Sequence, residues 1–226
     1  MIIAIDGPSG AGKSTVTKAV AKKLGFSCLD TGAMYRAIAW QAVNDKINLE
    51  DNEKLGLLAL AKQIEFTHVE GDPAPKQVFI DGNDVTLAIR TKEIDQAVSP
   101  VSAAPAVREA LVEQQRRIGT FGNYVVEGRD IGTVVFPDAE LKIFLTASDE
   151  ERAHRRVRQN VDRGVGSIDY LEVLEDIKRR DSYDSSRATS PLKPADDAVM
   201  LDSTDSYIED VIETICDMAR QKMGLE

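Results

Sequence analysis

The sequence has little cysteine and little histidine. Its 226 residues include two cysteines, Cys28 and Cys216, and two histidines, His68 and His154. Two isolated cysteines cannot build a disulfide framework, and neither histidine has neighbours at the spacing of zinc ligands. The composition therefore excludes a small disulfide-stapled domain and disfavours zinc or cysteine-based catalysis.

Long apolar runs and an excess of positive charge are also missing. No uncharged apolar stretch approaches the ~18 residues of a membrane span, and no basic residue precedes Lys13, unlike in a secretory signal. We expect a cytoplasmic protein with no membrane partner. The formal charge is −10, from 28 basic and 38 acidic side chains, which disfavours binding to long polyanions. We therefore expect small-molecule substrates, no nucleic-acid partner and a monomer.

The apolar residues that are present form short runs separated by helical patterns. Hydrophobic residues make up 42% of the chain, as in ordinary globular proteins. Strands and helices that alternate in this way indicate an α/β fold with a parallel sheet. Five runs predict its buried strands: Ile2–Asp6, Phe26–Asp30, Tyr124–Glu127, Leu141–Thr146 and Ala198–Asp202.

Helix signals lie between these strands. Residues 13–24 show a helical apolar stripe that stops at Gly25, and Ser148 with Glu151 forms a capping box for a helix ending at Gly164. Ser167 is the expected cap of the next helix. A loop is predicted over residues 183–197 and a C-terminal amphipathic helix over residues 206–223.

More than 90 residues separate the second and third predicted strands. A simple crossover needs only ~10 to 12 residues, so this interval predicts an insertion. Residues 63–69 and 77–80 are rich in β-forming residues and are joined through glycine and proline. A helix led by Pro105 follows, and the insertion is therefore expected to contain a small β unit and helices.

The first strand leads directly into GPSGAGKS at residues 7–14. A strand, a glycine-rich turn and a helix in this order form a P-loop, whose backbone amides surround a polyphosphate. Lys13 would reach the β- and γ-phosphates, and the hydroxyl of Ser14 would bind Mg²⁺. A chance glycine-rich turn is the alternative. The motif predicts a P-loop NTPase fold that binds a nucleoside triphosphate with magnesium.

Two basic segments lie in the C-terminal half of this acidic chain. The first contains five arginines, namely Arg152, Arg155, Arg156, Arg158 and Arg163; the second contains Lys178, Arg179, Arg180 and Arg187. Guanidinium groups match the geometry of phosphate oxygens, so these segments suit small anions. Because an exposed arginine is usually a solvated surface charge, we expect Arg155, Arg158 and Arg163 to solubilise their helix instead.

DTGAMYR at residues 30–36 and EGRDIGT at residues 127–133 each follow a predicted strand. Ligands of open parallel sheets bind beyond the carboxyl ends of the strands. Five segments occur in a fixed order along the chain: GPSGAGKS, DTGAMYR, EGRDIGTVVFPDA, ERAHRR and KRRDSYDSSR. Through them, nearly the whole chain resembles the bacterial cytidylate kinases, a family of nucleoside monophosphate kinases.

This resemblance implies one P-loop kinase domain over residues 1–226. Its five-stranded parallel sheet would be flanked by helices, with a monophosphate-binding insert at residues 31–119 and a short helical lid at residues 149–166. The implied reaction transfers the γ-phosphoryl group of ATP to CMP or dCMP, with Mg²⁺ as cofactor, in pyrimidine nucleotide metabolism. No protein nucleophile is implied, since alignment and charge neutralisation dominate phosphoryl transfer.

The resemblance also implies roles for individual residues. Lys13, Arg36, Arg129 and Arg187 would form the catalytic set that neutralises the phosphates. ATP would be bound by residues of the P-loop and the lid: Gly7, Pro8, Ser9, Gly10, Ala11, Gly12, Lys13, Ser14, Thr15, Arg152 and Arg156. The monophosphate would be bound by Thr31, Arg36, Ser99, Arg108, Arg129, Asp130, Arg180, Asp184 and Arg187.

Two positions depart from the commonest family pattern, with Glu127 in place of aspartate and Thr31 in place of serine. Both keep the functional group, and Glu127 either reaches the metal through water or caps its loop. A carboxylate such as Asp130 would accept from the cytosine amine but would face a carbonyl of uracil. We therefore expect CMP to be preferred to UMP.

Two other functions remain open from the sequence. A kinase with another acceptor, such as UMP, AMP or shikimate, would share the P-loop and the lid. A regulatory P-loop NTPase would hydrolyse its nucleotide without an acceptor, and it would leave Thr31, Arg108 and Asp130 without a role. The NKxD segment by which GTPases recognise guanine is absent from the sequence.

Overall fold

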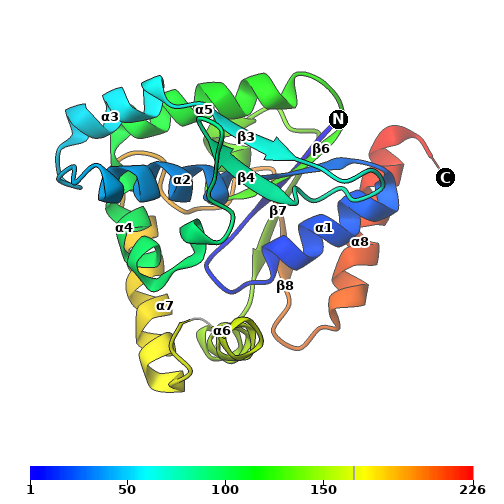
Figure 1. Ribbon diagram of the computed structural model, residues 1–226. Coiled ribbons are helices and arrows are strands. Elements are labelled where there is room, and N and C mark those ends of the chain that lie inside the picture. Colours follow the sequence, from blue (N-terminus) through cyan, green and yellow to red (C-terminus); the bar gives the residue numbers. More distant parts are fainter. Residues whose placement is uncertain (165, 226) are drawn as a thin grey trace. The chain divides into compact units, whose positions relative to one another are not determined.

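The computed structural model describes residues 1–164 and 166–225, with the side chain of Arg163 outside the described part. The chain, drawn in Figure 1, comprises two compact units. The first contains Met1–Leu29 and the chain from Gly122 onward, and the second contains Asp30–Phe121. The functional roles of the predicted insert (31–119) and lid (149–166) stay predictions. Val165, within that lid, lies outside the described residues.

The first unit is built on a five-stranded parallel sheet in the order β2-β6-β1-β7-β8. β1 lies in the middle, where Ile3 pairs with Val125 of β6 and with Leu141 of β7. Its residues Ile3 and Ile5 are fully buried, as continuous apolar strands of parallel sheets are. The strands are β1 (Ile2–Asp6), β2 (Ser27–Asp30), β6 (Tyr124–Gly128), β7 (Leu141–Thr146) and β8 (Val199–Asp202).

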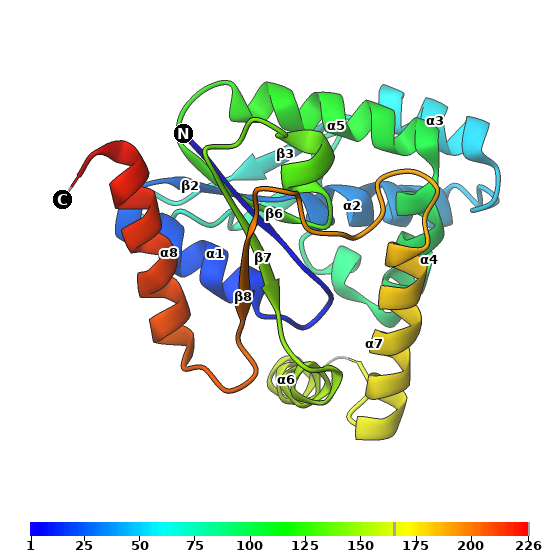
Figure 2. The same cartoon turned by 180° about the vertical axis from the view of Figure 1, so that it is seen from behind.

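The five strands confirm the sequence prediction to within one residue at each end. Helices α1 (Lys13–Leu24) and α8 (Ile208–Met223) lie side by side in this unit (Figures 1 and 2). Their apolar faces share one hydrophobic core with β1 and β7, in which Val20 and Ile215 are fully buried. The core thus fixes the start of α1, and with it the preceding loop, against the central strand.

Two further helices of this unit, α6 (Asp149–Arg163) and α7 (Tyr170–Ser185), pack on each other. Ser148 accepts a hydrogen bond from the amide of Glu151, and Gly164 ends α6 in the left-handed conformation, as predicted. The prediction for α7 was wrong at both ends. Asp169, and not Ser167, caps its start, and the helix continues to Ser185 into the predicted loop. Asp169 is closer to the first apolar residues, and an aspartate caps as well as a serine.

The second unit combines helices with a small antiparallel sheet in the order β3-β4-β5. Helix α2 packs on α4, and α3 packs on α5. Its elements are α2 (Thr31–Asn44), α3 (Asn52–Ala61), β3 (Ile64–Thr67), β4 (Gln77–Ile80), β5 (Asn83–Asp84), η1 (Ala88–Arg90), α4 (Lys92–Ala103) and α5 (Pro105–Gly119). The β unit and the helix led by Pro105 therefore form as predicted. Within the described part of the chain, no helix combines the length and apolar character needed to cross a bilayer.

Candidate nucleotide-binding site

The loop between β1 and α1 has the backbone conformation of a P-loop. Gly7, Gly10 and Gly12 all have positive φ angles, and Gly12 is the N-cap of α1. A Cβ atom on Gly7 would lie 2.0 Å from the carbonyl oxygen of Leu145. Only glycine fits this close approach to β7, and the loop therefore keeps its backbone amides free of side-chain obstruction.

The side chain of Lys13 folds back into this loop. Its Nζ donates hydrogen bonds to the carbonyl oxygens of Gly7 and Pro8, at 2.8 and 2.7 Å. Burial, and next the nearby guanidinium of Arg129, lower the pKa of Lys13. An incoming polyphosphate would supply the negative charge that this buried ammonium group needs.

Ser14 and Glu127 supply paired oxygen atoms next to the loop. The hydroxyl of Ser14 donates to Oε2 of Glu127 at 2.8 Å, and Glu127 is buried near the end of β6. Mg²⁺ is usually held by one or two such groups together with substrate phosphates and water. In the part of the chain that the structure describes, no cluster of three histidine, cysteine or acidic side chains could hold a metal alone. The hydroxyl of Ser14 and the carboxylate of Glu127 are oxygen donors of the kind that suits Mg²⁺.

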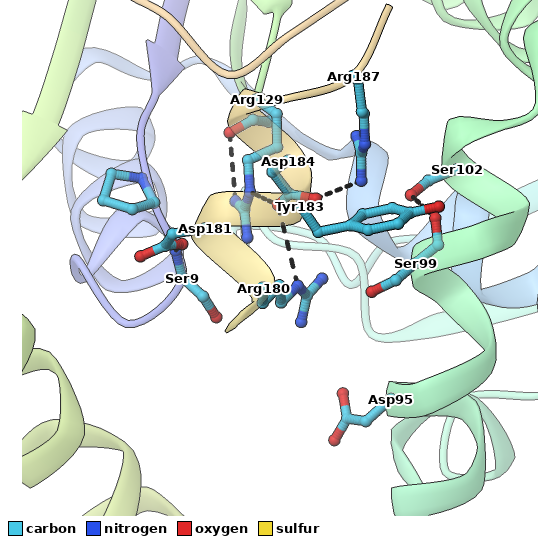
Figure 3. A network of polar contacts seen from close by, with 12 residues as sticks. Ser9, Asp95, Ser99, Ser102, Arg129, Arg180, Asp181, Tyr183, Asp184 and Arg187 are labelled. Atoms are coloured by element: carbon cyan, nitrogen blue, oxygen red, sulfur yellow. Dashed lines mark hydrogen bonds and ion pairs between the residues drawn. The ribbon is translucent and has the colours of Figure 1, made fainter. Parts of the chain in front are cut away.

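An arginine cluster surrounds Asp184 on α7 (Figure 3). Arg129 Nε lies 3.0 Å from Asp184 Oδ2, Arg187 pairs with Oδ1, and Arg180 Nε lies 4.0 Å from Oδ2. Burial opposes the charge of Asp184, but Arg129, Arg187 and Arg180 outweigh it and lower the pKa of this carboxyl group. Four predicted substrate-binding residues are thus brought together.

This cluster is joined to the P-loop through Arg129. The Nη1 atom of Arg129 donates to the carbonyl oxygen of Gly7 at 3.1 Å. Arg129 and the neighbouring buried Asp130 directly follow β6, which lies beside β1 in the sheet. The strand order therefore places both residues next to the start of the loop.

Arg152 and Arg156 of α6 both contact Ser9 in the P-loop. Arg152 is buried and donates to the carbonyl oxygens of Ser9 and Ala147, at 2.8 and 3.0 Å. It also pairs with Asp149 and Asp181. Arg156 donates to the hydroxyl of Ser9 at 3.0 Å. Both predicted ATP-binding arginines therefore lie at the loop, and Arg152 is held there by a set of acceptors.

Arg155 corrects one expectation, because it is not a solvated surface charge. Its guanidinium donates to the hydroxyl and the carbonyl oxygen of Ser203 at 3.0 and 2.6 Å, and it pairs with Glu151. The residue therefore ties α6 to the chain just after β8. Arg158, by contrast, has an exposed side chain, as predicted.

The second unit holds the remaining predicted residues, of which Thr31, Arg36 and Arg108 are buried. Arg36 donates to the carbonyl oxygen of Ile89 at 3.1 Å and pairs with Asp95. These contacts fix the guanidinium of Arg36 against η1 and α4.

Arg108 and Ser99 are linked within this unit through Ser102. Arg108 donates to the carbonyl oxygen of Ser102 at 3.1 Å, and the Ser102 hydroxyl donates to the carbonyl oxygen of Ser99 at 3.1 Å. The guanidinium of Arg108 also lies 5.4 Å from the centre of the Tyr35 ring. The two predicted residues thus share one local network.

Three acidic residues that contact predicted site elements were not predicted from the sequence. Asp95 pairs with Arg36, and Asp181 pairs with Arg152 and accepts from the amide of Ser9 at 3.3 Å. Asp6 accepts hydrogen bonds from the chain just after Asp130. The only sequence signal was that Asp6 and Asp181 lie beside or within conspicuous motifs.

Comparisons with known proteins identify the family of the chain. The family model described as cytidylate kinase matches residues 3–221. A cytidylate kinase of Pseudomonas paraeruginosa is 48% identical over 221 residues, which cover 98% of this chain and 96% of that protein. Cytidylate kinases of Saccharophagus degradans and Caldanaerobacter subterraneus are 49% and 50% identical, covering 98% and 97% of this chain and 98% and 94% of theirs.

One solved structure, of an uncharacterized protein from Eubacterium ventriosum, matches with a TM-score of 0.50 and 12% identity and covers 96% of this chain and 97% of that one. At this identity the match concerns the fold alone. The family model and the full-length relatives decide the classification, and the chain belongs to the cytidylate kinase family.

Proposed function

We propose that this protein transfers the γ-phosphoryl group of ATP to CMP or dCMP and so forms ADP and CDP or dCDP. The observation that carries the proposal is the match to cytidylate kinases over nearly the whole chain, at 48 to 50% identity. The P-loop and the arginine cluster around Asp184 support it, since such a reaction needs one site for a triphosphate and cations around the transferred group.

The reaction needs no covalent intermediate on the protein. A phosphate oxygen of CMP attacks the γ-phosphorus of ATP in line, and the bond between the γ-phosphorus and the β,γ-bridging oxygen breaks. A nucleoside monophosphate is largely ionised at neutral pH, so no strong general base is required. The electron pair of the broken bond remains on ADP.

Charge neutralisation falls to the basic side chains. Lys13 binds the β- and γ-phosphates. Its hydrogen bonds to the carbonyl oxygens of Gly7 and Pro8 are replaced by hydrogen bonds to phosphate oxygens. Arg129 and Arg187 neutralise the charge of the transferred phosphoryl group, and Asp184 holds both guanidiniums in place before substrate binds. Arg36 is assigned the same role from the second unit. Developing charge is best stabilised by groups that are already oriented.

Ser14 and Glu127 are the residues that would hold Mg²⁺, through the hydroxyl of Ser14 and the carboxylate of Glu127. When bound, the metal neutralises charge on the β- and γ-phosphates and orients them. The pairing of a hydroxyl and a carboxylate supports this assignment, because both present oxygen atoms to a hard cation.

Recognition of cytosine is assigned to Thr31, Ser99, Arg108 and Asp130, and contacts to the pentose to Arg180 and Asp184. The buried carboxylate of Asp130 would accept from the cytosine amine, whereas uracil would present a carbonyl oxygen to it. By comparison with other buried hydrogen-bonding sites, the preference for CMP over UMP should be ~10²-fold or more.

A coupled assay of ATP consumption tests the function with CMP, dCMP, UMP and AMP as acceptors and with no acceptor. Rapid consumption with CMP and dCMP supports the proposal, while equal hydrolysis without acceptor would favour a regulatory NTPase. Asp130→Ala should lose the preference for CMP while keeping its affinity for ATP. The monomeric state and the cytoplasmic location stay predictions, which light scattering and cell fractionation test.

A further inference from the structure

Asp6 is a buried acidic residue to which the proposed reaction gives no role. It is the last residue of β1, directly before the P-loop, and only 4% of its surface is exposed. Its Oδ1 atom accepts a hydrogen bond from the amide of Ile131 and its Oδ2 atom from the amide of Gly132, both at 2.8 Å. Both oxygens of the carboxylate are therefore used to hold two consecutive backbone amides.

These two amides begin η2 (Ile131–Val135), a short π-helical turn that directly follows Arg129 and Asp130. The first amides of a helical turn have no carbonyl partner within it and need an acceptor from elsewhere. The side chain of Asp130 does not cap the turn. The acceptor instead comes from a residue 125 positions away in the sequence, on the neighbouring strand.

The turn fits closely around Asp6. A Cβ atom on Gly132 would lie 3.1 Å from Cδ of Lys142 and 3.5 Å from Oδ2 of Asp6. On the other side of the turn, the amide of Val134 donates to the carbonyl oxygen of Asp130 at 2.9 Å. The backbone of Asp130 is thus held through the turn that Asp6 anchors, and a shift of η2 would move Asp130.

We propose that Asp6 is a positioning residue for the acceptor nucleotide: it fixes η2, and through it Asp130 and Arg129, to the first residues of the P-loop. This rests on the proposed function, in which Asp130 reads the cytosine base and Arg129 binds phosphate. Asp6 acts through the backbone and does not itself contact either substrate.

The charges around Asp6 agree with a role as a hydrogen-bond acceptor. Burial raises the pKa of Asp6 to about 6, the amides of Gly132 and Ile131 oppose the rise, Asp130 adds to it and Lys13 opposes it. The ammonium group of Lys142, whose stem packs near Gly132, is bound instead by Asp197 at 2.9 Å. At pH 7.5 and above, Asp6 is therefore mostly ionised and can accept from both amides.

Asp6→Asn tests the proposal, because the amide group keeps the shape of the side chain but can accept from only one of the two backbone amides at full strength. We expect kcat/KM for CMP to fall at least tenfold and the CMP to UMP ratio of kcat/KM to fall at least fivefold at pH 7.5. KM for ATP should change less than threefold. Loss of stability alone would reduce the active fraction without changing the CMP to UMP ratio.

Asp197→Asn is the matched control, because its carboxylate accepts from Lys142, whereas the amides of Ile131 and Gly132 donate to Asp6. It should leave both the ratio and kcat within twofold of the unmodified protein. If Asp6→Asn does not fold, Asp6→Glu decides: its carboxylate is displaced by one methylene group, and it should lower the CMP to UMP ratio.

An unchanged ratio in the folded Asn variant, or in the Glu variant if the former does not fold, overturns the role of Asp6. If the unmodified protein does not phosphorylate CMP in the presence of MgATP, the proposed function itself fails. Hydrogen exchange of the Ile131 and Gly132 amides gives an independent readout. Slow exchange in the unmodified protein that accelerates in the variant supports the anchor, and rapid exchange in both would refute it.

Discussion

The buried carboxyl group of Asp6 should leave a measurable mark on the pH dependence of stability. Its pKa is about 6 in the folded protein against an ordinary value of 3.8, so the folded state binds this proton more tightly than the unfolded state. The stability that the group contributes is fully present below pH 3.8 and is lost as the pH rises through 6. The direction is opposite to that of an acidic group held in an ion pair.

The magnitude follows from the two pKa values. A shift from 3.8 to about 6 corresponds to about 3 kcal/mol in total, at about 1.4 kcal/mol per unit. Integration of proton binding over pH shows that about 1.4 kcal/mol of this total is lost between pH 5 and pH 8. The side chain is almost fully buried, so solvent screening reduces this figure little.

Urea unfolding followed by circular dichroism at pH 5, 6, 7 and 8 measures the effect. Other groups also titrate, so the relevant quantity is the free energy of unfolding of the unmodified protein minus that of Asp6→Asn. This difference should fall by about 1.4 kcal/mol from pH 5 to pH 8, whatever its absolute value.

Asp197→Asn again provides the control. The hydrogen bond with Lys142 lowers the pKa of Asp197, so the contribution of Asp197 to stability changes only below about pH 4. The free energy of unfolding of Asp197→Asn, plotted against pH, should therefore run parallel to that of the unmodified protein. A difference between the unmodified protein and Asp6→Asn that stays constant with pH, or grows as the pH rises, would show that Asp6 does not have the raised pKa.

Three further substitutions test other parts of the structure. Gly7→Ala should weaken ATP binding at least tenfold by calorimetry, because its Cβ would lie 2.0 Å from the Leu145 carbonyl oxygen; near-normal binding would contradict the loop geometry. Asp184→Asn should lower the free energy of unfolding by about 3 kcal/mol, since three arginines lose their buried counter-charge, and an unchanged urea midpoint would argue against the cluster. Ser148→Ala should lower the free energy of unfolding by about 1 kcal/mol, because the cap of α6 is lost. Ser186→Ala, at the exposed end of α7, is the control and should change the free energy of unfolding little.

Much of the fold was predictable because its signals are local. The five strands are short apolar runs, and α1 ends at Gly25 because a glycine there adopts the left-handed conformation at no steric cost. Caps were less certain where several candidates lie close together. Ser167 and Asp169 both suit an N-cap, and Asp169, which is closer to the first apolar residues, is the one that caps α7.

The candidate site was predictable in its residue types but not in its contacts. A glycine-rich turn and an arginine-rich segment indicate phosphate binding from the sequence alone. The acidic partners of the arginines were not visible in this way. Asp184 meets Arg129 across 55 residues of sequence, and Asp95 meets Arg36 across 59, and no periodicity links residues so far apart.

By itself the sequence determined the strands, the P-loop and, through its motifs, the family, because each depends on neighbouring residues or on an ordered set of motifs. The tertiary structure alone decided how the charges are paired. The order β2-β6-β1-β7-β8 sets β6 beside β1, and only this adjacency brings the carboxylate of Asp6 to the amides of Ile131 and Gly132. Hydrogen bonds of this kind depend on atoms approaching within about 3 Å, and folding brings together atoms that lie far apart along the chain.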